Sequence, residues 1–199
     1  MGSHQRPTGA DPRGASSAHE AAISVHSVTA AYCPPRRLDP NDAVGTFVCR
    51  SSEQTTWLRH HARQSASTGT TRVFVVTAQD EVRVVAFYAW CMAQLDVQAA
   101  PTRLLKGAGR YPQPVPLLAR LGVDTQHEGN GLGAGLLVDA ITRLLALSGD
   151  IGCRGLIIHA ENDDARAFYL HLVPELETSP TDPRHLVLRM KDARATLLP

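Results

Sequence analysis

A glycine-rich segment in the second half of the chain restricts its fold more than any other feature. The segment TQHEGNGLGAG, residues 125–135, has four glycines in eleven residues. It follows the extended, apolar run VPLLARLGVD and leads into an apolar stretch with helical spacing. Because a glycine inside a helix costs about 1 kcal/mol relative to alanine, this cluster indicates that a ligand approaches the backbone closely. A strand, a glycine loop and a helix in this order most often bind a phosphate group.

Two well-known phosphate-binding loops do not fit this segment. A dinucleotide-binding GxGxxG loop follows the first strand of its βαβ unit, and a P-loop ends in a lysine followed by serine or threonine. Here the loop comes late in the chain, and Gly129, Gly131 and Gly133 have GxGxG spacing with no such lysine after them. The phosphate must therefore belong to another class of ligand.

Length and composition indicate one globular domain. The chain has 199 residues, of which 43% are hydrophobic, and we expect no membrane span. Residues 1–22 are small, polar and rich in proline and glycine, which predicts a disordered leader before a single domain at 23–199. The four cysteines form no CxxC pair, so neither a metal site nor a disulfide framework is expected, and a reducing cytoplasm is favoured.

The hydrophobic pattern predicts a mixed α/β domain around one sheet. Runs rich in β-branched and aromatic residues predict strands, and two of them separated by three residues predict a β-hairpin. The predicted strands are 23–32, 71–78, 82–95, 115–124, 153–160 and 185–190. Apolar residues at helical spacing predict helices at 51–66, from 132 onward and at 163–172, whereas 98–114 is expected to be a long loop.

Residues 126–131, QHEGNG, fit the pattern Q/R-x-x-G-x-G/A, which resembles the acetyl-CoA signature of the GCN5-related N-acetyltransferases. The context is similar too, because a strand ends at Asp124, an amphipathic helix follows, and Asn162 precedes a short helix with a Phe-Tyr pair. Within that family, DAVGTFVCRSSEQTTWLRHHARQSASTGTTRVFVV, PVPLLARLGVD and ARAFYLHL resemble the acetyltransferase toxins of bacterial toxin–antitoxin pairs, a likeness that covers roughly 36–190.

The resemblance implies a central, mostly antiparallel sheet that splays around acetyl-CoA, with flanking helices. Backbone amides from Gln126 to Ala134 would hold the pyrophosphate at the start of the helix. The strand before the loop would bind the pantetheine arm, and the amide of Val123 would hold the developing oxyanion. The expected cofactor-binding residues are Leu121, Val123, Gln126, Gly129, Asn130, Gly131, Leu132, Gly133, Ala134, Asn162 and Phe168.

Tyr169 is the expected general acid, which would donate a proton to the departing thiolate. The alternative is a core tyrosine whose hydroxyl bonds the backbone. Asn162 would either contact the cofactor or cap its helix. No general base is evident, and none is needed for an α-amine whose pKa is near 7.7–8.0. The absence of a base favours an aminoacyl-tRNA acceptor over a lysine side chain.

The charge is unevenly distributed along the chain. Residues 36–120 carry 11 basic and 6 acidic residues, whereas residues 121–199 carry 7 basic and 11 acidic ones. The middle of the chain is therefore the expected face for an anionic partner such as RNA. Arginine pairs with phosphate and stacks on unpaired bases. The candidate nucleic-acid-binding residues are Arg36, Arg37, Arg59, Arg63, Arg72, Arg103, Lys106, Arg110 and Arg120.

The resemblance therefore implies an acetyl-CoA-dependent toxin that acetylates the α-amino group of aminoacyl-tRNA and blocks translation. The resemblance also implies a ribbon-helix-helix antitoxin as partner, and we expect a homodimer. Two departures from the pattern are Arg50, where most relatives have a small residue or glycine, and Val173-Pro174, where most have Gly-Phe. Two alternatives stay open: an acetyltransferase of a small amine or protein amine, and a non-catalytic module that binds CoA or RNA.

Overall fold

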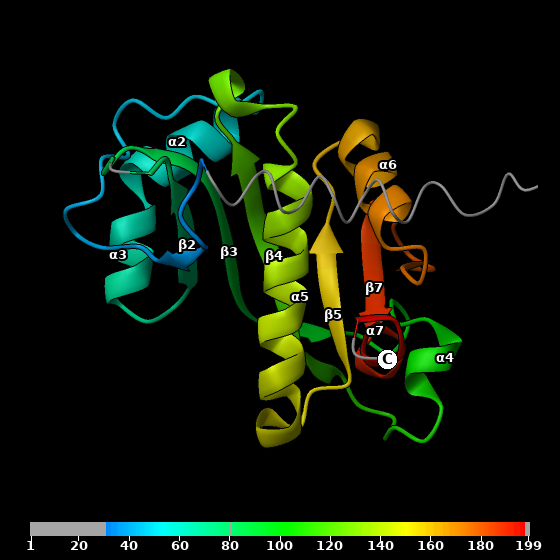
Figure 1. Ribbon diagram of the computed structural model, residues 1–199. Helices are drawn as coiled ribbons and strands as arrows, with labels where there is room; N and C mark the ends of the chain where they lie inside the picture. Colours follow the sequence, from blue (N-terminus) through cyan, green and yellow to red (C-terminus); the bar gives the residue numbers. More distant parts are fainter. Residues whose placement is uncertain (1–30, 80, 198–199) are drawn as a thin grey trace, which may run out of the picture.

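The computed structural model in Figure 1 describes residues 31–79 and 81–197. The predicted leader at 1–22 and most of the strand predicted at 23–32 lie outside these residues. The strands are β1 (Arg36–Arg37), β2 (Arg72–Thr77), β3 (Val84–Leu95), β4 (Gln113–Val123), β5 (Gly155–His159), β6 (Glu177–Thr178) and β7 (His185–Arg189). The helices are α2 (Ser52–His60), α3 (Ala62–Ser67), α4 (Thr102–Leu105), η1 (Thr125–His127), α5 (Leu132–Ile151), α6 (Asp163–Leu172) and α7 (Met190–Leu197).

The seven strands form one sheet in the order β1-β2-β3-β4-β5-β7-β6. Every neighbouring pair is antiparallel except β4 and β5, which are parallel. The predicted mixed α/β fold and the β2–β3 hairpin are therefore confirmed. The residues of β3 are divided between two core clusters, one on each face of the sheet, which is why seven consecutive positions from Val84 are buried.

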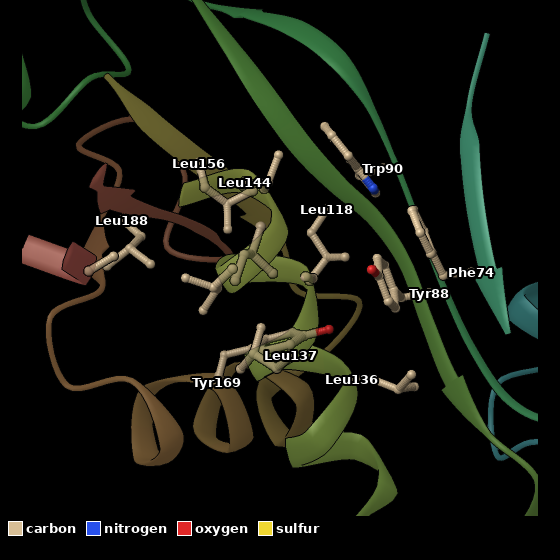
Figure 2. Packing of buried hydrophobic residues seen from close by; sticks show 14 of the residues in the cluster. Phe74, Tyr88, Trp90, Leu118, Leu136, Leu137, Leu144, Leu156, Tyr169 and Leu188 are labelled. Carbon is tan, nitrogen blue, oxygen red and sulfur yellow. The ribbon is translucent and has the colours of Figure 1, made fainter. Parts of the chain in front are cut away.

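Helices cover both faces of the sheet. On one face, α5 lies along β3 and β4 and its apolar stripe packs on Tyr88, Leu118 and Leu156 (Figures 1 and 2). On the other face, α2 and α3 bury Leu58 and Ala62 against Phe87. The predicted apolar face of α5 is confirmed, and its buried residues are Leu132, Leu136, Leu137, Ala140, Ile141, Leu144, Leu145 and Ser148.

Three sequence predictions need correction. The single helix predicted at 51–66 is divided into α2 and α3 at His61, which caps the end of the first and the start of the second, and its backbone amide donates to the Trp57 carbonyl. His61 is exposed rather than part of the buried face. The loop predicted at 98–114 contains the short helix α4 and ends where β4 begins. After the last predicted strand, the chain continues as α7, and β6 adds an edge strand beside β7.

One helix, α5, is long and apolar enough to cross a membrane by length and composition alone, which the sequence analysis did not expect. In the fold its apolar stripe packs against the sheet, and Tyr88 of β3 donates a hydrogen bond to Asp139 on this helix at 2.7 Å. The hydropathy of α5 thus reflects a core helix.

Gly122 of β4 provides a test of the packing beneath the sheet. A Cβ atom there would lie 2.9 Å from Cε1 of Phe87 and 3.4 Å from Sγ of Cys49. We therefore predict that Gly122→Ala lowers the free energy of unfolding by about 1–3 kcal/mol. In the control Gly149→Ala, on α5, the added Cβ meets nothing within 4 Å, and helix propensity should raise stability by up to about 1 kcal/mol. Equal stability of the two variants in urea unfolding would contradict this packing.

Candidate active site

The site begins where β4 separates from β5. β4 pairs with β3 from Gln113 to Val123, but with β5 only at Leu117 and Leu118. The register between β3 and β4 shifts at this point, because Ala89 pairs with Arg120 and Trp90 with Leu118. Ala119 is thus an extra residue on β4, a β-bulge that bends the strand. Beyond it, one edge of β4 lies open, which confirms the predicted splay.

The open edge presents backbone groups of β4. The amide of Asp124 donates to the Val85 carbonyl on β3 at 2.8 Å. Because successive peptide groups of a strand point to opposite sides, the amides of Leu121 and Val123 point away from β3, toward the open edge. These are the two strand residues that the sequence predicted for cofactor binding.

Asp124 fixes the loop that follows β4. Asp124 is 1% exposed, and its carboxylate accepts hydrogen bonds from the amides of Val48 and Gln126, each at 3.0 Å. Arg83 joins the loop as well, with Nη2 at 3.4 Å from Asp124 Oδ2 and 2.8 Å from Gln126 Oε1. The amide of His127 bonds the Asp124 carbonyl. The predicted cradle therefore needs correction, because the amides of Gln126 and His127 are already used within the turn.

The next amides, from residue 128 to residue 134, have no hydrogen-bond partner within the described residues. Gly129 and Gly131 adopt left-handed backbone conformations, with φ of 78° and 75°. Gly131 is the N-cap of α5, with no side-chain cap, and no acidic residue occupies the first turn. The positive end of a 20-residue helix is thus open to an anion. The Asn130 side chain bonds the carbonyls of His127 and Glu128 and so stabilises the loop.

α6 lies across the opening from β4. Asn162 caps this helix, because its side chain accepts the Ala165 amide at 2.8 Å. Capping was one of its two predicted roles, and contact with a cofactor stays a prediction. Phe168 packs against α5 where Gly133 lacks a side chain, since a Cβ there would lie 3.2 Å from the Phe168 ring. Gly133 therefore permits close packing of the two helices.

Tyr169 reaches from α6 toward the sheet beside Leu137 (Figure 2). It is 7% exposed and lines a cleft between β4 and α6. Burial, and then the negative charge of Glu161, raise the pKa of Tyr169 to about 12. By contrast, Tyr88 is fully buried and donates its hydroxyl to Asp139, as a structural tyrosine does. The Val173-Pro174 departure lies beyond Tyr169, where the Val173 amide bonds the Tyr169 carbonyl and ends α6.

The cleft contains residues that the sequence analysis missed. Its lining is Gln54, Leu118, Ala119, Arg120, Leu121, His159, Glu161, Ala165 and Tyr169. Gln54 comes from α2 and Glu161 from the turn before α6, so only the folded chain brings them together. The sole sequence signal for Glu161 was its place beside Asn162, and Gln54 had none.

The predicted basic residues fall into three groups. Arg59, Arg63 and Arg120 lie on α2, α3 and the adjacent strand β4, and Arg120 pairs with Glu53 and lies over the Trp57 ring. Arg103, Lys106 and Arg110 lie in and after α4, at the opposite end of the sheet from α2 (Figure 1). Arg103 pairs there with Glu177 and Asp192.

Arg36, Arg37 and Arg72 lie on β1 and β2. Arg36 makes two hydrogen bonds to the buried carboxylate of Asp42, which raise the pKa of Arg36. Arg63 Nη2 donates to the Asp42 carbonyl at 2.6 Å. Arg36 thus has a structural partner, whereas Arg37 and Arg72 are exposed. No group of metal-ligating side chains occurs in the described part of the chain, and its four cysteines are free.

Comparison with known proteins identifies relatives of this chain. No protein-family model matches the chain. A tRNA-acetylating toxin from Mycobacterium tuberculosis is 43% identical over 168 residues, which are 83% of this chain and 97% of that protein. A probable toxin TacT from Sinorhizobium fredii is 23% identical, over 80% of this chain and 92% of that protein.

Solved structures show the same fold. A tyrosine-to-phenylalanine mutant of KacT matches with a TM-score of 0.76 and 20% identity, over 83% of this chain and 99% of that one. AtaT complexed with acetyl-methionyl-tRNAfMet matches with a TM-score of 0.76 and 21% identity, over 83% of this chain and 98% of that one. The 43% identity extends over nearly all of the mycobacterial protein. The chain therefore belongs to the family of tRNA-acetylating toxins, a branch of the GCN5-related N-acetyltransferases.

Proposed function

We propose that this protein transfers the acetyl group of acetyl-CoA to the α-amino group of aminoacyl-tRNA. The proposal is carried by one observation: an anion-binding helix end and a cleft with a tyrosine hydroxyl both adjoin strand β4. The open N-terminus of α5 follows β4 in the chain, and the cleft lined by Tyr169 also includes Ala119 and Leu121 of that strand. An anion-binding helix end beside a proton donor suits acyl transfer from a phosphorylated carrier.

The residues at the α5 N-terminus fit acetyl-CoA. Free amides from residue 128 to residue 134 and the helix dipole would hold its pyrophosphate. The backbone groups of Leu121 and Val123 would bond the pantetheine arm as a neighbouring strand does. The Val123 amide would then hold the oxyanion that forms when the thioester is attacked. Bound acetyl-CoA supplies an activated acetyl group, and the protein supplies its position.

Tyr169 would donate a proton to the sulfur of coenzyme A as this thiolate leaves the thioester. With a pKa raised to about 12, its hydroxyl remains protonated throughout the working pH range. A thiol has a pKa of about 8.5, so complete transfer from this phenol is uphill unless another proton replaces the one it gives. The attacking nitrogen loses a proton in the same reaction. We therefore assign Tyr169 the role of holding its proton toward the sulfur and completing the transfer as the nitrogen's proton is released.

The acceptor side suits an amine that needs no base. An α-amine has a pKa of about 7.7–8.0, and an adjacent ester lowers it further, so much of it is neutral at pH 7. The basic residues of α2 and α3, Arg59 and Arg63, would contact the phosphates of the acceptor RNA. The relative from Mycobacterium tuberculosis is a tRNA-acetylating toxin, which supports this acceptor.

The biological setting follows from the same family. We propose that the protein acts in the cytoplasm as a translation-blocking toxin, as a homodimer, and that a ribbon-helix-helix antitoxin restrains it. AtaT, a protein of the same fold, has been solved bound to the C-terminus of its antitoxin AtaR. The fold likeness supports a comparable partner here.

The test of the acceptor is direct. Purified protein is incubated with labelled acetyl-CoA and, separately, with charged tRNA, uncharged tRNA, a polyamine and a peptide. The proposal expects label on charged tRNA alone. Label on the polyamine or peptide would instead identify an acetyltransferase of small or protein amines. Binding of acetyl-CoA without transfer to any amine would identify a non-catalytic module.

The cofactor site can be tested at its glycines. We predict that Gly131→Glu abolishes acetyl-CoA binding, because a carboxylate at the N-cap of α5 would occupy the anion site. The control Gly152→Glu carries the same charge and the same backbone strain, since φ of Gly152 is 63°, but it lies at the other end of α5. Calorimetry should show unchanged affinity for the control. Equal affinities for both folded variants would disprove this assignment of the pyrophosphate site.

The role of Tyr169 can be separated from packing by a pair of tyrosine variants. Tyr169→Phe should lower single-turnover transfer about 100- to 10,000-fold, the usual contribution of a positioned acid, and leave acetyl-CoA affinity nearly unchanged. Tyr88→Phe, which loses the bond to Asp139, should lower the melting temperature and leave transfer intact. The wild-type rate should rise with pH as the amine loses its proton, with no decline from Tyr169 until the pH nears 12. A reversed pattern for the two variants would make Tyr169 structural.

The RNA face can be located by salt dependence. Binding of charged tRNA should weaken steeply between about 50 and 200 mM salt, because phosphate contacts release counterions. The double variant Arg59→Ala/Arg63→Ala should reduce the slope of log affinity against log salt by roughly two. The control pair Arg103→Ala/Lys106→Ala, at the other end of the sheet, should leave the slope unchanged. A slope reduced only in the control would place the RNA on the α4 side.

A further inference from the structure

Gln54 is a buried polar residue in the cleft whose partner is missing. It lies in the first turn of α2, where its backbone N–H donates a hydrogen bond to Oγ of Ser51 at 3.1 Å. It is only 8% exposed, and it lines the same cleft as Arg120, Glu161 and Tyr169. Its Oε1 atom is buried, and within the described residues no donor reaches it. A buried carbonyl oxygen without a donor is unfavourable for the free protein.

A second buried glutamine shows what a structural role looks like. Gln113, at the start of β4, is 4% exposed. Its Nε2 donates to the carbonyls of Gly109 and Tyr111, at 3.3 and 2.8 Å. Gln113 thus holds the loop before β4, whereas the buried Oε1 of Gln54 has no donor within the described residues. The contrast indicates that Oε1 of Gln54 gains its hydrogen-bond donor from a bound ligand.

The charged neighbours of Gln54 are already engaged. Arg120 pairs with Glu53 at 2.5 Å, and the Ser51 hydroxyl donates to Glu161 Oε1 at 2.7 Å. Of the side-chain atoms that line the cleft, Oε1 of Gln54 is the one that is buried and has no donor within the described residues. A group that satisfies it must bring an N–H or O–H donor. An attacking amine carries such donors and, in its neutral form, the lone pair that the reaction needs.

We propose that Oε1 of Gln54 accepts a hydrogen bond from the amine nitrogen of the acceptor and so aims its lone pair at the thioester. This inference rests on the proposed acetyl transfer and names a residue that positions the nucleophile. As the nitrogen attacks, it gains positive charge and its N–H groups become stronger donors. The hydrogen bond to Gln54 then strengthens toward the transition state, so it favours turnover more than binding.

The test compares variants at the two buried glutamines. Gln54→Met keeps the length of the side chain and removes the oxygen that lacks a donor. It should raise the melting temperature, yet lower single-turnover transfer about 10- to 100-fold, the effect of losing a hydrogen bond to a charged group. Acetyl-CoA affinity by calorimetry should not change. The control Gln113→Met should lower the melting temperature and leave transfer per folded molecule unchanged.

A third variant, Gln54→Glu, adds a readout that packing alone does not move. A carboxylate at this position still accepts a hydrogen bond and also stabilises the protonated amine. Transfer should therefore exceed that of Gln54→Met at high pH, and the rise of rate with pH should move to higher pH. A purely structural Gln54 predicts no such movement.

The outcomes separate this inference from the proposed function. If the wild type acetylates charged tRNA and Gln54→Met does so at the same rate, the proposed role of Gln54 is wrong and the proposed function still holds. A lower melting temperature for Gln54→Met with normal transfer would do the same. If wild type acetylates the polyamine or peptide instead of charged tRNA, the proposed acceptor fails, and the same variants are compared on that amine. Failure of wild type to transfer to any amine would overturn both.

Discussion

The whole site depends on the point where β4 stops pairing with β5. The bulge at Ala119 bends β4 so that it stays with β3 and leaves β5 after Leu118. Had the two strands paired along their full length, the backbone of Leu121 and Val123 would be satisfied within the sheet. Because they separate, a strand edge inside the domain is left for a ligand to complete. A closed sheet would offer neither this edge nor the cleft beneath α6.

The other elements stabilise that opening without closing it. The buried side chain of Asp124 anchors the turn after β4. Arg83 donates hydrogen bonds to the side chains of Asp124 and Gln126 in the same turn. The amides that follow are left free at the start of α5. On the far side, α6 places Tyr169 in the cleft while its N-cap and its last turn are satisfied by Asn162 and Val173. The side chains of Asp124 and Asn162 are thus paired within the protein, whereas the amides at the start of α5 have no partner within the described residues.

Local pattern explains why much of this was predictable. The glycine cluster at 129–133 indicated a phosphate-binding loop before a helix, and the helical spacing around Phe168 and Tyr169 placed them on α6. The cleft lining from α2 was not predictable, because only long-range packing places Gln54 in the same cleft as Tyr169. From its charge alone, Arg36 was a candidate phosphate contact. In the structure it pairs with the buried carboxylate of Asp42, six positions away. α7 escaped prediction since its buried Ala193 gives a weak hydrophobic signal.

Amide hydrogen exchange with and without acetyl-CoA tests the central claim most directly. The account predicts that acetyl-CoA slows exchange at Leu121 and Val123 and at residues 128–134, because these amides gain partners only when the ligand is bound. The amides of Gln126 and His127, already bonded within the turn, should change less. Protection confined to another face of the molecule, or no protection at the edge of β4 despite saturating ligand, would contradict the assignment of this splayed edge as the acetyl-CoA site.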